Sequence, residues 1–207
     1  MQRTMTLALV AGLAAAAISM AAEPTAPAKP APNKAIALVQ AGPVGPALVS
    51  RVRQFVEDNI GVSVRLLPAQ EPAGKTLDEE GAAVSALMTD RDICLVALVM
   101  PTEGIKAHGV ILPQKHVAVV NAGALKPAGN DTEKYARRLE RETMQSIGLL
   151  LGVSYCPNPQ CVLWAYTTDD ELDAKGRNFC PPCLEKVQRA ARENGAKLAE
   201  IGVAAPP

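Results

Sequence analysis

Aromatic residues and unbalanced charge are both scarce in this sequence of 207 residues. Phenylalanine, tryptophan and tyrosine make up 3% of it, which argues against a surface that stacks on bases or sugars. Lysine plus arginine equals aspartate plus glutamate, at 21 each, and there is no basic stripe. Neither nucleic acid nor an anionic membrane surface is therefore expected as a partner. The apolar residues are mainly aliphatic, which predicts one aliphatic core for a chain of this length.

The beginning of the sequence has the pattern of a signal peptide. Arg3 precedes an apolar run that extends from about Leu7 to Met20, and small residues follow at a cleavage-like position. The run is short for a membrane span, which needs about 20 residues, but an uncleaved signal anchor remains an alternative. No cysteine comes directly after the run, which disfavours a lipoprotein.

A segment rich in alanine, proline and lysine comes next and is typical of an exposed linker. We therefore expect an exported protein that is periplasmic or extracellular. The expected organisation is a signal peptide over 1–21, a linker over 22–34 and one domain over 35–207.

Apolar periodicity predicts that strands and helices alternate along this domain. A long helix is expected to begin at Asn130 or Asp131 and to end at Gly152, a residue suited to a left-handed cap. This order indicates an α/β or α+β layered domain. The strands are expected near 35–41, 62–67, 93–100, 109–112 and 117–121, and the other helices near 48–60, 76–88 and 182–201.

The cysteine spacing is the most specific pattern in the chain. It consists of Cys156-x4-Cys161 and Cys180-x2-Cys183, separated by a spacer over 162–179. Two close pairs with such a spacer suit a tetrahedral zinc site, because each pair brings two thiolates to neighbouring vertices. Two disulfides remain an alternative for an exported protein, and a redox-active Cys180–Cys183 pair is another. Cys94 lies in a buried-strand pattern and is expected to be an inert core residue.

The stretch Arg141–Cys183 resembles the archaemetzincins, zinc peptidases that carry HExxHxxGxxH, then C-x4-C-x-M, and later CxxC. The step from Gly152 to Cys156 matches the family pattern, and Gly148 matches a small residue often found inside its HExxH. Upstream, DICLVALVM and HVAVVNAGAL resemble the two strands before the active-site helix. The resemblance implies a zincin-like fold with a twisted mixed sheet, a long active-site-type helix and a C-terminal subdomain clamped by zinc on four cysteines.

The catalytic positions of the family are all different in this chain. A catalytic zinc needs three protein ligands and a general base, and this register supplies neither. Gln145, Leu149 and Tyr155 stand for the three histidines, Ser146 for the catalytic glutamate and Leu163 for the Met-turn methionine.

Few other residues are candidates for chemistry. His108 and His116 are the only histidines. Both precede the long helix, and we do not expect either of them to approach the cleft in which the family binds its catalytic zinc. Glu140 and Glu142 are expected on a solvated helix face. The acidic residues between 169 and 173 do not have EF-hand spacing and are expected at a solvated helix start or turn.

We therefore expect an exported, catalytically inactive archaemetzincin-like protein with one structural zinc, which binds a peptide or protein partner without cleaving it. Two other functions stay open. An active zinc peptidase with atypical ligands predicts a second metal, and an envelope thiol–disulfide protein predicts reactive thiols and no zinc.

Overall fold

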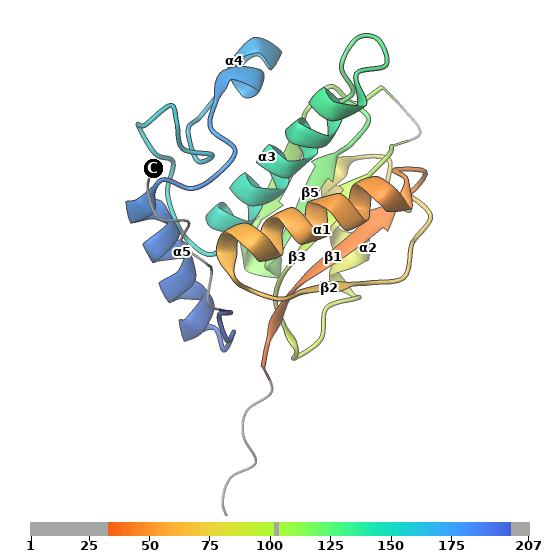
Figure 1. Cartoon of the computed structure of the whole chain (residues 1–207). Helices are drawn as coiled ribbons and strands as arrows, with labels where there is room; N and C mark the ends of the chain where they lie inside the picture. Colours follow the sequence, from red (N-terminus) through yellow and green to blue (C-terminus); the bar gives the residue numbers. More distant parts are fainter. Residues whose placement is uncertain (1–32, 102–103, 200–207) are drawn as a thin grey trace, which may run out of the picture. The chain divides into compact units, whose positions relative to one another are not determined.

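The computed structural model describes residues 33–101 and 104–199 (Figure 1). The predicted signal peptide and most of the predicted linker lie outside these residues. Asn33 and Lys34, at the end of the predicted linker, contact the C-terminal segment. The Lys34 amide donates to the Gly195 carbonyl at 3.1 Å, and the Asn33 side chain accepts from the Lys197 amide at 2.7 Å. Within the described part of the chain, no helix combines the length and apolar character that crossing a bilayer requires.

A five-stranded mixed sheet forms the centre of the domain, in the order β2-β1-β3-β5-β4. Neighbouring strands are parallel except for β4, which is antiparallel to β5 and lies at one edge. Every residue of β3 is buried, as expected for a parallel strand covered on both faces. The strands are β1 (Ala35–Ala41), β2 (Val64–Leu66), β3 (Asp92–Val99), β4 (Gly109–Leu112) and β5 (Val117–Asn121).

Helices cover both faces of this sheet. Alternate side chains of β1, β3 and β5 point to one face, where α1 and α3 lie side by side, or to the other, where α2 packs (Figure 1). This arrangement confirms the predicted α/β class with a mixed sheet and one long helix. The helices are α1 (Pro46–Ile60), α2 (Leu77–Ser85), α3 (Thr132–Leu150), α4 (Asp169–Ala174) and α5 (Pro181–Glu193), with a 3₁₀ turn η1 at Pro113–Lys115.

The predicted ends of α3 are confirmed. Asp131 caps its beginning by accepting a hydrogen bond from the Lys134 amide at 2.8 Å. At the other end, Gly152 adopts a φ of +79° and its amide donates to the Leu149 carbonyl, while the Val153 amide donates to the Gly148 carbonyl. These two bonds form a Schellman motif, which turns the chain away from the helix toward the first cysteine pair.

The predicted extent of the last helix is wrong. The expectation placed it up to Ile201, whereas α5 ends at Glu193. Gly195 turns the chain with a φ of +96°, and Leu198 then forms an antiparallel bridge with Val62. The apolar spacing of Leu198 fits a helix, but its actual partner is distant in sequence and the glycine decides the outcome.

Candidate functional site

The four cysteines of the two predicted pairs converge on one point. Their Sγ atoms all lie within 4.8 Å of one another, and those of Cys156 and Cys180 are 3.8 Å apart. A tetrahedral zinc with Zn–S bonds of about 2.3 Å places its sulfur ligands roughly 3.8 Å from each other. All four residues are thiols without a disulfide. The donor set and its spacing therefore fit one zinc ion.

Two short turns hold these cysteines. In the first, the Cys161 amide donates to the Asn158 carbonyl at 3.0 Å, and the Cys156 amide donates to the Leu163 carbonyl at 3.0 Å. In the second, Cys180 caps α5 and its carbonyl accepts the Cys183 amide at 2.9 Å. The turns are joined directly, since the Cys180 amide points at the Cys161 sulfur at 3.4 Å. An amide directed at a thiolate sulfur stabilises its negative charge, which supports the fit to a metal.

A cleft of about 590 Å³ lies between α3 and the segment that leads into β4. Gln145 and Leu149 are four residues apart and therefore share the face of α3 that borders this cleft. Tyr155 borders it from beyond the helix and is 57% exposed. The structure thus brings together the four residues that stand, in the predicted register, at the positions of the family's three histidines and catalytic glutamate. The cleft is lined by Lys106–Ile111, Glu142, Gln145, Ser146, Leu149, Tyr155 and Ala165–Thr167.

The fifth substituted position, Leu163, is fully buried beneath α3. Gly148 faces it, and a Cβ atom at Gly148 would stand 2.9 Å from Leu163 Cδ2 and 2.8 Å from Phe179 Cε1. The predicted small residue in this turn of α3 therefore permits close packing between the helix and the cysteine-bearing segment.

Of the two histidines, only His108 borders the cleft, contrary to the expected arrangement. Its Nδ1 lies 2.8 Å from the Tyr166 hydroxyl, and its Nε2 lies 3.4 Å from an Asp169 carboxylate oxygen. Burial lowers the pKa of His108, while Asp169 opposes this effect. His116 is exposed at the end of η1, where it adopts a φ of +52°.

The expectation of a solvated face for Glu140 and Glu142 is wrong. The Glu140 side chain is 2% exposed, with Arg51 Nε at 2.8 Å and Arg177 Nη1 at 2.9 Å from its carboxylate oxygens. Glu142 borders the cleft, and burial raises its pKa. Helix α3 is buried on nearly all sides because α1 and the cysteine spacer both cover it, so its carboxylates are buried with cationic partners.

One functional candidate, Lys175, was missed by the sequence reasoning. Its side chain is 0% exposed, and its Nζ donates a hydrogen bond to Gln145 Oε1. The same Nζ lies 3.9 Å from Glu142 Oε1 and 4.5 Å from the centroid of the Tyr166 ring. Burial lowers the pKa of Lys175 to about 8, and Glu142 opposes this effect. A single lysine in a polar spacer carries no sequence signal that distinguishes it from a solvated one.

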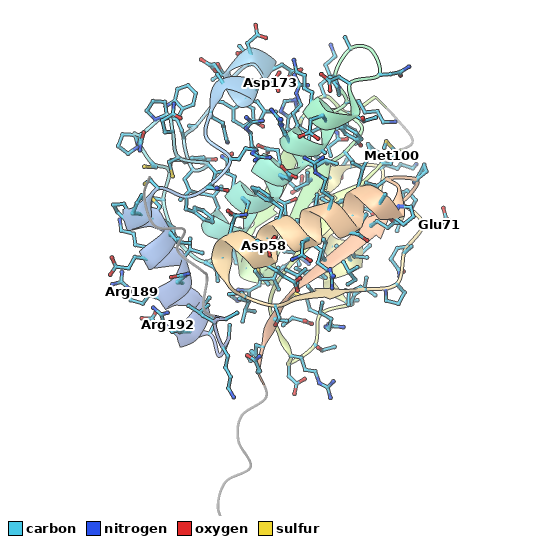
Figure 2. All side chains as sticks on the ribbon, in the orientation of Figure 1. Asp58, Glu71, Met100, Asp173, Arg189 and Arg192 are labelled. Atoms are coloured by element: carbon cyan, nitrogen blue, oxygen red, sulfur yellow. The ribbon has the colours of Figure 1, made fainter. Side chains whose placement is uncertain are left out.

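The acidic segment before Lys175 begins a helix, as predicted, but its charges are not simply solvated. Thr168 and Glu171 form a capping box at the beginning of α4. Arg138, whose side chain is 3% exposed, binds Asp173 through two bonds of 2.8 and 2.7 Å and Asp169 through one of 2.8 Å. Asp173 lies on α4 at the top of the view in Figure 2, away from Arg189 and Arg192 of α5. These ion pairs dock the cysteine spacer on α3.

Comparison with known proteins places these features in a family context. The model of "Peptidase family M54" matches residues 106–189. Archaemetzincin from Thermococcus kodakarensis is 28% identical over 183 residues, which cover 75% of this chain and 96% of that protein. Archaemetzincin from Methanopyrus kandleri is 32% identical over 83 residues, which cover 40% of this chain and 46% of that protein.

Solved structures share the fold. The crystal structure of archaemetzincin from Methanopyrus kandleri has a TM-score of 0.59 at 22% identity, and covers 77% of this chain and 96% of that chain. A zinc-dependent peptidase from Methanocorpusculum labreanum has a TM-score of 0.61 at 18% identity, and covers 73% of this chain and 99% of that chain.

Proposed function

The chain is archaemetzincin-like, and on this premise we propose that it is an exported, non-catalytic relative of the zinc peptidases. It holds one structural zinc at its four clustered cysteines and binds extended peptides in the cleft beside β4 without cleaving them. The export part of this proposal depends on the signal-peptide pattern of residues 1–21.

The observation that carries the proposal is the chemistry of the cleft. The positions that correspond to two zinc-binding histidines and the catalytic glutamate are Gln145, Leu149 and Ser146, and all three border one cleft. An aliphatic side chain offers no ligand, and a serine hydroxyl does not act as the carboxylate base that activates a zinc-bound water. Tyr155 is a poor substitute for the remaining histidine. These residues do not fit a catalytic zinc.

Peptide binding is supported by the open edge of the sheet. Within residues 33–101 and 104–199, β4 pairs with β5 alone, so its outer edge is unpaired. The Asn121 amide donates to the His108 carbonyl, and alternation along an antiparallel ladder then directs the main-chain groups of Gly109 and Ile111 outward. An extended peptide that forms a further strand there satisfies these groups.

Elemental analysis tests the metal part of the proposal. The full-length protein is purified without a chelator or a metal-affinity tag, and its metal content and accessible thiols are counted. We expect one zinc per chain and four protected cysteines, with Cys94 buried separately. Two metals per chain would support an active peptidase with atypical ligands. Metal-free protein with oxidised cysteines would support disulfides or the thiol–disulfide function.

Peptide arrays test the binding part of the proposal. Each peptide that binds is resynthesised in two versions, one with N-methyl groups at its odd-numbered residues and one with N-methyl groups at its even-numbered residues. Strand addition uses the N–H groups of every second residue, so one version should lose binding and the other should keep it nearly unchanged. Incubation with the protein should leave the peptides intact by mass spectrometry. Equal loss of binding in both versions, or peptide cleavage, would contradict the proposed mode.

A further inference from the structure

In the described part of the chain, Lys175 is the largest side chain among those that are almost completely buried. It does not line the cleft itself, but its charged end contacts Gln145 and Glu142, which do. Its Nζ lies near the Gln145 carbonyl oxygen, the Glu142 carboxylate at 3.9 Å and the Tyr166 ring at 4.5 Å. An amide oxygen, a carboxylate and an aromatic face all favour a cation. A cation is therefore the group around which this end of the cleft is built.

Gln145 connects this observation to the lost metal site. In the register above, Gln145 stands where the first zinc ligand is expected, and its side-chain oxygen accepts a hydrogen bond from Lys175. Residue 145 thus still contacts a positive charge, but this charge is the ammonium of Lys175 and not a metal ion. We propose that the Lys175 ammonium replaces the catalytic-type metal as the cation beside Gln145 and acts as a positioning residue for Gln145 and Glu142.

The backbone around Lys175 holds the ammonium in this place. Arg141 on α3 donates to the Lys175 carbonyl at 3.0 Å and to the Asp173 carbonyl at 2.9 Å. The next residue, Gly176, passes so close to Gln160 that a Cβ atom would stand 1.9 Å from the Gln160 carbonyl oxygen. The Gly176 amide also donates to the Pro159 carbonyl at 3.0 Å. Backbone contacts of Asp173, Lys175 and Gly176 thus fix the position from which the Lys175 side chain reaches Gln145.

An ammonium in this position also opposes metal binding. A divalent cation held by residue 145 would stand close to Nζ, with little water between them to screen the repulsion. Restoring the lost ligands should therefore be insufficient to restore the metal while Lys175 is present. This consequence distinguishes an internal cation from a lysine that merely fills space.

Metal counting in a ligand-restored protein tests this consequence. The full chain carries Gln145→His, Ser146→Glu, Leu149→His and Tyr155→His, with Lys175 either kept or changed to Met, and each protein is loaded with zinc. Methionine keeps the aliphatic volume of the lysine without its charge. We expect one zinc per chain with Lys175 and two with Lys175→Met, in proteins whose circular dichroism matches the unmodified chain. A second zinc in both proteins, or in neither, would overturn the proposal.

A double-mutant cycle tests the same inference in the native cleft. Lys175→Met leaves Glu142 as a buried carboxylate without its cation, which should raise the unfolding equilibrium constant about a hundredfold or more. Adding Glu142→Gln removes that charge and should recover about tenfold or more of the loss. Additive effects of the two substitutions would contradict the proposal. Lys126→Met, at an exposed lysine, is the matched control and should leave unfolding unchanged.

The inference rests on the loss of the catalytic metal that is part of the proposed function, but not on peptide binding. Two metals in the unmodified protein would refute the proposed function before any variant is made. A failed double-mutant cycle in a protein with one zinc would refute only the role of Lys175.

Discussion

The cysteine cluster and the cleft are neighbours, since Cys156 belongs to one and the adjacent Tyr155 to the other, yet their charges are arranged in opposite ways. In the cluster, four sulfur atoms converge within 4.8 Å and present only ligands. At the cleft, the Glu142 carboxylate and the Gln145 amide oxygen face a buried cation that belongs to the chain, Lys175. Under the two proposals above, one cation site is filled by zinc from solution and the other by a side chain of the protein itself, and the two sites should respond differently to metal removal and to mutation.

The largest expected effect is at the cluster. Cys180→Ser removes one zinc ligand, and the free energy of zinc binding is also folding free energy in such sites, at about 10 kcal/mol or more. We expect loss of the zinc and unfolding of the segment that carries α4 and α5. Elemental analysis and limited proteolysis would measure these changes.

Cys94→Ala is the matched control for this substitution, because Cys94 is a buried cysteine of β3 that is not part of the cluster. It should keep the zinc and cost about 1 kcal/mol through a small cavity. Zinc retention in Cys180→Ser together with an unchanged proteolysis pattern would show that the cluster is not a structural metal site.

The next effect concerns the ion pairs that dock the spacer on α3. Arg138→Met leaves Asp173 with only the Lys134 ammonium, at 2.8 Å, and should lower the free energy of unfolding by about 2 kcal/mol. Urea unfolding would measure the change. Lys134→Met is the control, because the side chain of this lysine is 41% exposed and its ion pair should contribute about 0.5 kcal/mol or less. Equal effects of the two substitutions would mean that the burial of Arg138 does not increase the contribution of its ion pairs to stability.

The free energy of unfolding should depend on pH through His108. Burial holds the pKa of His108 below its ordinary value of about 6.5, so the unfolded chain binds the proton first as the pH falls. The stability contributed by neutral His108 is therefore present above pH 6.5 and decreases as the pH falls below it. The groups that face the ring are Tyr166, Asp169 and Arg138.

Unfolding free energies between pH 7.5 and pH 5 would measure this contribution. His108→Asn should make the decrease toward acid smaller, whereas His116→Asn, at an exposed histidine, should leave it unchanged. A steeper decrease in His108→Asn would contradict the sign of the pKa shift.

The smallest effect on stability is expected at Tyr155, which borders the cleft but is 57% exposed. Tyr155→Ala should change the free energy of unfolding by less than about 0.5 kcal/mol but weaken peptide binding about tenfold, since exposed aromatic residues are frequent binding anchors. Fluorescence anisotropy with a labelled array peptide would measure the affinity. Leu66→Ala, at an exposed apolar residue of β2 that does not line the cleft, should leave binding unchanged.

Local signals in the sequence predicted much of the fold and the positions that meet at the cleft. The apolar run that forms β3, the Asp131 cap and the Gly152 turn each act over a few residues, so their patterns can be interpreted without knowing the rest of the chain. The cysteine spacing works in the same way, because each pair forms its own turn. The family register added the grouping of Gln145, Leu149 and Tyr155.

The charged interior could not be predicted in this way. Glu140, Glu142 and Lys175 have the composition of a solvated surface, and their burial depends on α1 and the spacer closing over α3 from distant parts of the sequence. The end of α5 shows the same limit. A pattern of apolar residues extends past Gly195, but the partner of Leu198 is Val62, which no local pattern identifies.

Lys175 has one more consequence through its place in the sequence, between Cys161 and Cys180. The segment that zinc would clamp is the same segment that delivers the ammonium to the cleft. Occupancy at the two sites is then thermodynamically linked, and linkage is reciprocal. If bound zinc strengthens the contact between Lys175 and Gln145 by some factor, that contact must increase the affinity for zinc by the same factor. A ligand that displaced the ammonium from Gln145 would therefore lower the affinity of the four cysteines for zinc.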